Sequence, residues 1–302
     1  MASLLSVENL QVQFQTKKGI NTAVDGVSFS IKKGRILGIV GESGCGKSVT
    51  SMSILQLLGS NARISGGSIK LDGKELIGLP EKEMCRIRGN DIAMIFQDPM
   101  TALNPTLTIG TQLMEPIMLH QNCGKKEAWT RAVDVLKRVG IAAPEKRMKE
   151  YPHQLSGGMR QRVMIAMAVS CEPRLLIADE PTTALDVTIQ AQILELMCEL
   201  REKMGTAIML ITHDMGVVAE TADDVLVLYA GKAVEYGSIE DIFERPKHPY
   251  TQGLLNSIPR LDEDVELLNT IEGTVPAPDA MPAGCRFAPR CPYGKDRCMK
   301  EK

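Results

Sequence analysis

Short apolar segments and longer amphipathic segments alternate along the chain. Residues 5–14 alternate apolar and polar side chains, as a half-buried strand does, and later segments that are continuously apolar predict buried strands. These buried strands are predicted at 35–41, 91–96, 174–179, 206–212 and 224–231. Apolar residues at helical spacing predict helices at 46–59, 125–140 and 157–171. Strands separated by helices predict an α/β fold with a largely parallel sheet whose faces are covered.

The pattern also divides the chain into regions. Residues 98–172 are rich in predicted helix and indicate an insert on the sheet. Beyond the last predicted strand, prolines interrupt the segments 245–255 and 273–285, which indicates a separate C-terminal extension. We therefore predict a domain over residues 1–240, with a helical subdomain over residues 98–172, and an extension over residues 241–302.

The composition changes this picture only by exclusion. The 302 residues are 44% hydrophobic and 24% charged, and the formal net charge is −2, which does not favour nucleic acid or anionic lipid. The N-terminus lacks the pattern of a signal peptide, and no apolar run reaches the roughly 18 residues of a membrane span, so we expect neither. Five scattered cysteines lack pairing spacings, as in chains of a reducing compartment. They are Cys45, Cys85, Cys123, Cys171 and Cys198.

The first candidate for chemistry is the segment GESGCGKS, residues 41–48, between a predicted strand and a predicted helix. It fits the P-loop pattern G-x-x-x-x-G-K-[ST]. Glycines let the backbone curl so that its N–H groups point at a triphosphate, and the helix adds its positive end. Lys47 would place a charge on the β- and γ-phosphates, and the Ser48 hydroxyl would bind Mg²⁺. The predicted nucleotide contacts of this segment are Gly41, Ser43, Gly44, Cys45, Gly46, Lys47, Ser48 and Val49.

A second candidate lies where the predicted strand 174–179 ends in Asp179 and is followed by Glu180. A carboxylate at such a strand end can hold Mg²⁺ beside a P-loop. Glu180 can polarise a water for in-line attack on the γ-phosphate. An apolar strand that ends in Asp-Glu is common, and by itself it is a solvated strand end. Beside a P-loop, the pair indicates a nucleoside triphosphatase.

The segment LSGGM, residues 155–159, narrows the class. Ser-Gly-Gly before a helix is another phosphate-binding helix start, although alone it also reads as an N-cap serine with flexible glycines. Together with the other motifs it resembles the signature LSGGQ of the ATP-binding cassette (ABC) family, with Met159 in place of Gln. The resemblance covers residues 4–240. Gln97 matches the Q-loop glutamine, residues 184–186 the D-loop, His213 the switch histidine, and Phe14 the aromatic residue that stacks on adenine.

The resemblance implies a fold and a mechanism. The implied fold is a P-loop NTPase cassette, with a RecA-like parallel sheet, an antiparallel β-subdomain and a helical insert. Two cassettes dimerise head to tail, so each ATP lies between the P-loop of one and the signature of the other. Ser156, Gly157 and Gly158 would then contact the partner's ATP. Catalysis would rest on Glu180, His213 and Lys47, and Mg²⁺ would be held by Ser48, Gln97 and Asp179.

Residues 245–259, RPKHPYTQGLLNSIP, are similar to a segment of the dipeptide and oligopeptide permease ATPases, a group with relatives that import nickel or nickel chelates. This similarity implies the ATPase subunit of a bacterial peptide importer, peripheral on the cytoplasmic face of the membrane. The implied partners are a sibling ATPase in a heterodimer, two transmembrane permease subunits and an extracytoplasmic substrate-binding protein, without nucleic acid. A nickel importer and a single-cassette ATPase outside transport are the alternatives.

Three further cysteines, Cys285, Cys291 and Cys298, lie near the end of the sequence. Their spacing C-x₅-C-x₆-C fits neither paired zinc ligands nor ferredoxin motifs, so the spacing leaves both free thiols and a metal site open. In some peptide-permease ATPases a tail of this form, with a fourth cysteine further downstream, binds a [4Fe–4S] cluster. The sequence has no cysteine after Cys298. The resemblance therefore implies an incomplete candidate cluster site, with a structural or redox-sensing role.

Overall fold

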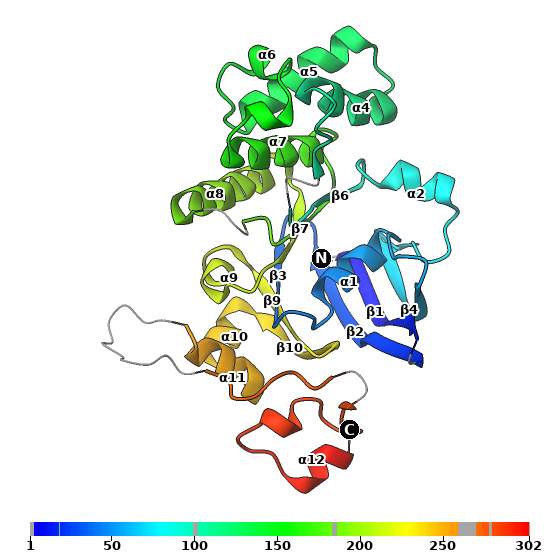
Figure 1. Ribbon diagram of the computed structural model, residues 1–302, viewed down its shortest axis with the longest axis vertical. Coiled ribbons are helices and arrows are strands. Elements are labelled where there is room, and N and C mark those ends of the chain that lie inside the picture. Colours follow the sequence, from blue (N-terminus) through cyan, green and yellow to red (C-terminus); the bar gives the residue numbers. More distant parts are fainter. Residues whose placement is uncertain are drawn as a thin grey trace. The chain divides into compact units, whose positions relative to one another are not determined.

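The computed structural model describes residues 3–17, 19–98, 102–182, 186–258, 270–277 and 280–301 (Figure 1). The chain forms two compact units. Unit 1 consists of Met1–Gly78 and Ile211–Lys302, and unit 2 consists of Leu79–Leu210. Within the described ranges, no helix combines the length and the apolar character that crossing a membrane requires.

Unit 1 contains an antiparallel sheet whose long strand follows the alternating segment predicted from the sequence. Its strands are β1 (Ser3–Thr16), β2 (Gly19–Lys32), β4 (Ala62–Leu71) and β5 (Lys74–Glu75), paired in the order β2-β1-β4-β5. Leu5 and Val7 are buried, and so are Leu10 and Val12. The alternation therefore changes phase between the two pairs. A bulge accounts for this change, and Asn9 within it has a φ of 49°.

Unit 1 also contains three strands that lead to the candidate site. They are β3 (Ile36–Val40), β9 (Asp224–Tyr229) and β10 (Lys232–Ser238), neighbours in the order β10-β9-β3. β3 and β9 are parallel, whereas β9 and β10 are antiparallel. Every residue of β3 is buried, which explains why its sequence is continuously apolar.

The described helices of unit 1 are short. They are α1 (Lys47–Ile54), α9 (Met215–Thr221), α10 (Ile239–Glu244), α11 (Pro249–Asn256), α12 (Asp296–Lys300) and the 3-10 helix η3 (Ala288–Arg290). The prediction of a helix over 46–59 has the correct start but the wrong end. Gln56 has a φ of 50°, and its side-chain amide donates a hydrogen bond to the Leu76 carbonyl oxygen, so the helix ends before it.

Unit 2 combines parallel strands with a group of helices. Its strands are β6 (Ile92–Ile95), β7 (Leu175–Asp179) and most of β8 (Ala207–Ile211), in the order β8-β7-β6. Its helices are α2 (Glu81–Ile87), α4 (Ile109–Gln121), α5 (Lys125–Arg138), α6 (Pro144–Arg147), η1 (Pro152–Gln154), α7 (Gly157–Val169) and α8 (Val187–Met204). Helices α4, α5 and α7 pack on one another within the predicted insert (Figure 1).

Three aromatic side chains join the C-terminal segment, which comprises the described residues 270–277 and 280–301, to the rest of unit 1. Tyr229 of β9, Tyr250 of α11 and Phe287 are all buried. The ring centroid of Tyr229 lies 4.6 Å from that of Tyr250 and 5.1 Å from that of Phe287. Such pairs contribute about 0.5–1.5 kcal/mol each beyond the burial of their surface. Phe287 therefore anchors the C-terminal segment in the core of unit 1, while the domain boundary at residue 240 stays a prediction.

Candidate nucleotide-binding site

Residues 41–46 form a tight loop between β3 and α1, and Lys47 and Ser48 begin the helix. Gly41, Gly44 and Gly46 have φ angles of 151°, 77° and 102°, which residues with a side chain rarely adopt. A Cβ atom on Gly41 would lie 2.1 Å from the Leu228 carbonyl oxygen, so the loop requires glycine at this position. In the described part of the chain, no side chain caps the start of α1. The N–H groups of its first turn can therefore bind an anion.

Lys47 is the first residue of α1, and its side chain reaches back to the loop. The residue is only 6% exposed, and its ammonium donates hydrogen bonds to the carbonyl oxygens of Gly41 at 2.7 Å and Glu42 at 3.1 Å. A phosphate oxygen carries a full charge and is a stronger acceptor than these neutral carbonyl groups. The ammonium is thus held where it can exchange neutral acceptors for phosphate.

The other predicted nucleotide contacts in residues 41–49 differ in their exposure to solvent. Ser43, Gly44 and Ser48 are exposed and Val49 is half-buried, whereas Cys45 is buried. Burial raises the pKa of the Cys45 thiol, and the Lys47 charge opposes this rise only in part. Cys45 is therefore a protonated packing residue of the loop at neutral pH, and its contribution to nucleotide contact is its backbone.

Gln97 and Glu180, two predicted site residues of unit 2, are in direct contact. Asp179 ends β7 and is buried, and Glu180 follows it with a φ of 47°. The Gln97 side-chain amide, which comes shortly after β6, donates a hydrogen bond to Glu180 Oε2 at 2.8 Å. The contact brings together two side chains that are 83 positions apart in the sequence. It holds the carboxylate that the sequence marks as the base.

The signature segment begins α7 on an exposed surface of unit 2. The Ser156 hydroxyl oxygen accepts a hydrogen bond from the Met159 N–H at 3.3 Å, so the N-cap interpretation is correct as far as local structure goes. Ser156 and Gly157 are exposed, and a Cβ atom on Gly157 would have no neighbour within 4 Å among the described residues. A Cβ atom on Gly158 would lie 3.2 Å from Ile189 Cγ2 of α8. The first turn of α7 is therefore open to a ligand from outside the unit.

His213 and Phe14 lie in unit 1. The Thr212 N–H donates to the Ile39 carbonyl oxygen at 3.2 Å, which places exposed His213 near the end of β3 from which the P-loop departs. Phe14 is half-buried on β1 and pairs with Asn21 of β2. Of the predicted D-loop, Ala184 and Leu185 lie outside the described residues. Asp186 is the N-cap of α8 and accepts from the Ile189 N–H at 3.0 Å.

The three late cysteines do not gather as ligands. Cys285 and Cys291 pack against the aromatic cluster, and the Cys285 N–H donates to the Cys298 carbonyl oxygen at 2.8 Å. In the part of the chain that the structure describes, no group of three or more His, Cys, Asp and Glu side chains is arranged to hold a metal ion. The arrangement of these thiols thus gives the predicted iron–sulfur site no support.

The structure adds two contacts to one P-loop residue, Glu42, that the sequence did not predict. The Glu42 N–H donates to the Tyr250 hydroxyl at 3.0 Å, and the Glu42 carboxylate accepts from Arg290 at 2.9 and 3.0 Å. Glu42 occupies a variable position of the motif pattern, and no periodicity connects it to residues more than 200 positions away. The signal that was present is the segment KHPYTQ, which contains Tyr250.

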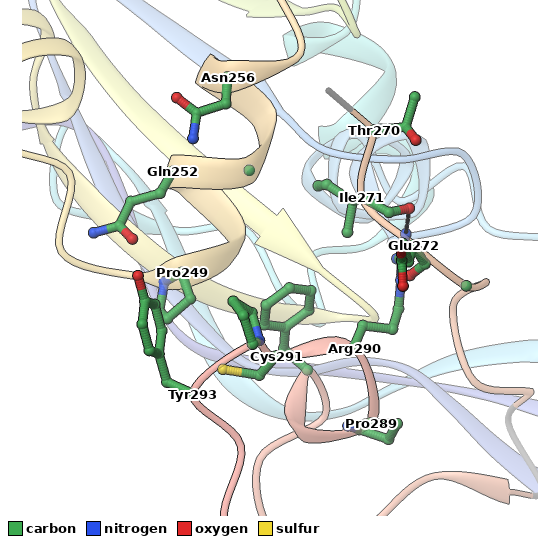
Figure 2. Close-up of a pocket in the computed structure, with 14 residues that line it drawn as sticks. Pro249, Gln252, Asn256, Thr270, Ile271, Glu272, Pro289, Arg290, Cys291 and Tyr293 are labelled. Atoms are coloured by element: carbon green, nitrogen blue, oxygen red, sulfur yellow. Dashed lines mark hydrogen bonds between the residues drawn. The ribbon is translucent and has the colours of Figure 1, made fainter. Parts of the chain in front are cut away.

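A cavity of about 600 Å³ lies elsewhere in unit 1, between α11 and the C-terminal segment (Figure 2). Its walls include Gln252 and Asn256 of α11, together with Cys291 and Tyr293. Figure 2 shows Arg290 reaching toward Ile271, whose carbonyl oxygen accepts a hydrogen bond from its guanidinium group at 3.2 Å. The residues that line the cavity all come from positions 249–256, 270–273 and 287–293, so it is distinct from the P-loop.

Comparison with known families and sequences relates both parts of the chain to transport proteins. A family model described as "ABC transporter" matches residues 24–183, and one described as "Oligopeptide/dipeptide transporter, C-terminal region" matches residues 234–298. The oligopeptide transport ATP-binding protein AppD of Bacillus subtilis is 58% identical over 99% of this chain and 91% of its own length. The oligopeptide transport ATP-binding protein OppD of Escherichia coli is 54% identical over 98% of this chain and 88% of its own length.

Solved structures give the same relationship. The ATP-binding cassette MJ0796, in a dimeric post-hydrolysis state bound to ADP and Pi, matches with a TM-score of 0.70 and 28% identity, over 78% of this chain and 98% of that one. CbiO1 from Clostridium perfringens, part of the ABC transporter complex cbiONQ, matches with a TM-score of 0.69 and 29% identity, over 81% and 92%.

Proposed function

The chain belongs to the ABC transporter family, and on this basis we propose that it is the ATP-hydrolysing subunit of a bacterial importer of oligopeptides or dipeptides. The observation that carries the substrate class is the match of residues 234–298 to the C-terminal region of oligopeptide and dipeptide transporters. The names of the similar proteins AppD and OppD support peptide over nickel and over a role outside transport.

Unit 1 supplies the groups that bind the nucleotide. The curled P-loop and the uncapped start of α1 bind the phosphates through backbone N–H groups, and Lys47 turns from the Gly41 and Glu42 carbonyl oxygens to the β- and γ-phosphates. Phe14 stacks on the adenine. Unit 1 also supplies the Ser48 hydroxyl, whose oxygen is of the type that Mg²⁺ prefers, as are the oxygens of Gln97 and Asp179 from unit 2. The ion that these residues would hold would neutralise charge on the phosphates.

Unit 2 supplies the group that activates water. Glu180 accepts a proton from the attacking water, and Gln97 orients its carboxylate through the observed hydrogen bond. His213 would contact the γ-phosphate. Catalysis in this scheme consists mostly of positioning and of electrostatic stabilisation by Lys47 and by the partner's signature.

A second cassette completes the site. The exposed first turn of α7, with Ser156, Gly157 and Gly158, would bind the triphosphate held by a sibling ATPase, and this chain's ATP would meet the sibling's signature. ATP then closes the dimer, and loss of the γ-phosphate opens it. On the cytoplasmic face of the membrane, the ATPase pair would dock on two transmembrane permease subunits, which would convert this motion into transport. A substrate-binding protein outside would deliver the peptide.

We expect Gly157→Asp to abolish peptide uptake, and this variant tests the proposed function. The space around Gly157 accommodates the side chain, and an acidic residue in the first turn favours the helix. The new carboxylate would face the partner's triphosphate, and such like-charge contacts cost several kcal/mol, of which each 1.4 kcal/mol is a factor of about ten. The measurement is the uptake of a labelled tripeptide and of labelled nickel by cells whose only copy carries the variant.

Gly124→Asp is the matched control, because Gly124 is the exposed N-cap of α5 and also has open space around its Cβ position. It should leave peptide uptake unchanged. Loss of nickel uptake with normal peptide uptake would favour the nickel importer. Normal uptake of both peptide and nickel by the Gly157→Asp variant would show that the signature segment has no role in transport.

The iron–sulfur cluster remains a proposal about Cys285, Cys291 and Cys298 that rests on the family resemblance. Protein purified without oxygen should contain about four irons and four acid-labile sulfides per chain if the cluster forms. Cys291→Ser should then lose them, whereas Cys85→Ser, at an exposed cysteine elsewhere, should retain them. One zinc per chain would indicate a structural metal site instead. Protein that contains neither iron nor zinc would contradict the proposal.

A further inference from the structure

Helix α11 and the C-terminal segment hold the P-loop at one residue, Glu42. The Glu42 side chain is bound by the Arg290 guanidinium, which donates to both carboxylate oxygens, at 2.9 and 3.0 Å. Its backbone N–H is bound separately, by the Tyr250 hydroxyl at 3.0 Å. Two residues from beyond position 240 thus fix both the side chain and the peptide of one P-loop residue.

Both holding groups are themselves rigidly placed. The Arg290 side chain is 6% exposed, and its remaining donors bind the carbonyl oxygens of Glu272 at 2.9 Å and Ile271 at 3.2 Å. Tyr250 is fully buried among Tyr229 and Phe287. Burial raises the pKa of its hydroxyl, so that group stays neutral at physiological pH.

Glu42 is in turn connected to the phosphate-binding lysine. The Glu42 carbonyl oxygen accepts a hydrogen bond from Lys47 Nζ at 3.1 Å. The neighbouring Gly41 carbonyl oxygen accepts another at 2.7 Å. The orientation of the peptides at residues 41 and 42 therefore sets where the ammonium rests and where the first N–H groups of the loop point.

We propose that Arg290 and Tyr250 are positioning residues for ATP binding, which act through Glu42 on the conformation of the P-loop. This inference rests on the proposed function as an ATPase. The C-terminal segment then does more than complete the core of unit 1, because it preorganises the phosphate-binding loop. Preorganised groups bind a ligand more tightly because less ordering is left to be done on binding.

The test is the dissociation constant of Mg·ATP for the full chain, measured by titration calorimetry, beside the thermal unfolding temperature without nucleotide. Arg290→Gln, Glu42→Gln and Tyr250→Phe should each weaken ATP binding by about five- to tenfold, a fraction of what loss of a direct charged contact costs. The double variant Arg290→Gln with Glu42→Gln should weaken ATP binding no more than either single variant, because both substitutions break the same ion pair. Arg290→Lys should restore part of the affinity, since it keeps the charge but not the bidentate geometry.

Two matched controls separate positioning from stability. Arg286 lies in the same segment and pairs with Asp25 at 2.6 Å. The Tyr236 hydroxyl donates to the Ser30 carbonyl oxygen at 3.1 Å. Neither of these two interactions involves a P-loop residue. Arg286→Gln and Tyr236→Phe should lower the unfolding temperature as their counterparts do, yet bind ATP like the unmodified chain.

Equal ATP affinity in Glu42→Gln, Tyr250→Phe and the unmodified chain would overturn the inference. Fully additive losses in the double variant would do so as well. If Arg290→Gln does not fold, Glu42→Gln breaks the same pair from its more exposed side, and Tyr250→Phe removes only one oxygen. Failure of the unmodified chain to bind ATP would instead refute the proposed function.

Discussion

Replacing Glu180 by Gln is expected to lower the rate of ATP hydrolysis by about 10²- to 10⁴-fold, the usual contribution of a general base. An amide cannot take the proton of the attacking water, but it has nearly the same shape as a carboxylate. The Gln97 amide that now donates to Glu180 Oε2 can donate equally to an amide oxygen. The site should therefore keep its geometry and its ATP, and lose only the chemical step.

Two measurements on the assembled ATPase pair check this prediction. Phosphate release should fall, while ATP binding persists and the ATP-bound dimer accumulates on size-exclusion chromatography. The accumulation is expected because, in the proposed mechanism, closure depends on bound ATP and opening depends on its hydrolysis.

Glu172→Gln provides the matched control for Glu180→Gln. Glu172 also lies in unit 2 and also has a positive φ, of 53°, but its carboxylate pairs with Arg138 at 3.0 Å on the surface. Surface pairs of this kind contribute at most about 1 kcal/mol to stability, so turnover should be unchanged. Normal turnover in Glu180→Gln itself would contradict the assignment of the base.

The parts of the fold that sequence predicts best are the fully buried ones. All residues of β3, β7 and β8 are buried, so each appears in the sequence as a continuous apolar segment with no competing pattern. The ABC cassette fold that the motifs implied is confirmed by the family match and by the solved structures.

Partly exposed strands were not predicted from the pattern of apolar residues. In β4, with the sequence ARISGGSIKL, only Ile69 and Leu71 are buried, and two glycines interrupt the alternation. β10 has no fully buried residue. Such strands are specified by pairing with neighbours rather than by their own hydrophobicity, so the antiparallel sheet was expected only from the family resemblance.

The candidate site shows the same division between local and long-range information. The glycine angles of the P-loop and the Ser156 cap depend on a few adjacent residues, and short motifs predicted those positions. The pair Glu42–Arg290 spans 248 positions and exists only because α11 and the C-terminal segment pack on unit 1. Neither the hydrophobic periodicity nor the spacing of motifs can predict a contact between residues so far apart in the sequence. The proposed roles of the site residues stay predictions that the variants test.

Lys47→Ala should weaken ATP binding by about 30-fold to several thousandfold. Removing one member of a desolvated charge pair costs about 2–5 kcal/mol, and each 1.4 kcal/mol is a factor of about ten. The loop itself should survive, because alanine favours the helix that begins at this residue and the glycine turns do not depend on the ammonium. The carbonyl oxygens of Gly41 and Glu42 would lose their Lys47 donor, a cost of about 1–3 kcal/mol for each one that stays buried without another partner.

Lys232→Ala tests whether the loss in Lys47→Ala is specific to the P-loop. Lys232 is a second lysine of unit 1, and its ammonium lies 3.2 Å from Asp25 Oδ2. It removes the same charge from the same unit, so a long-range effect of net charge on ATP would appear in both variants. We expect the dissociation constant for Mg·ATP to change in Lys47→Ala alone. An equal and small change in both would mean that the ammonium inside the loop does not reach the phosphates, and the P-loop would then bind ATP through its backbone N–H groups.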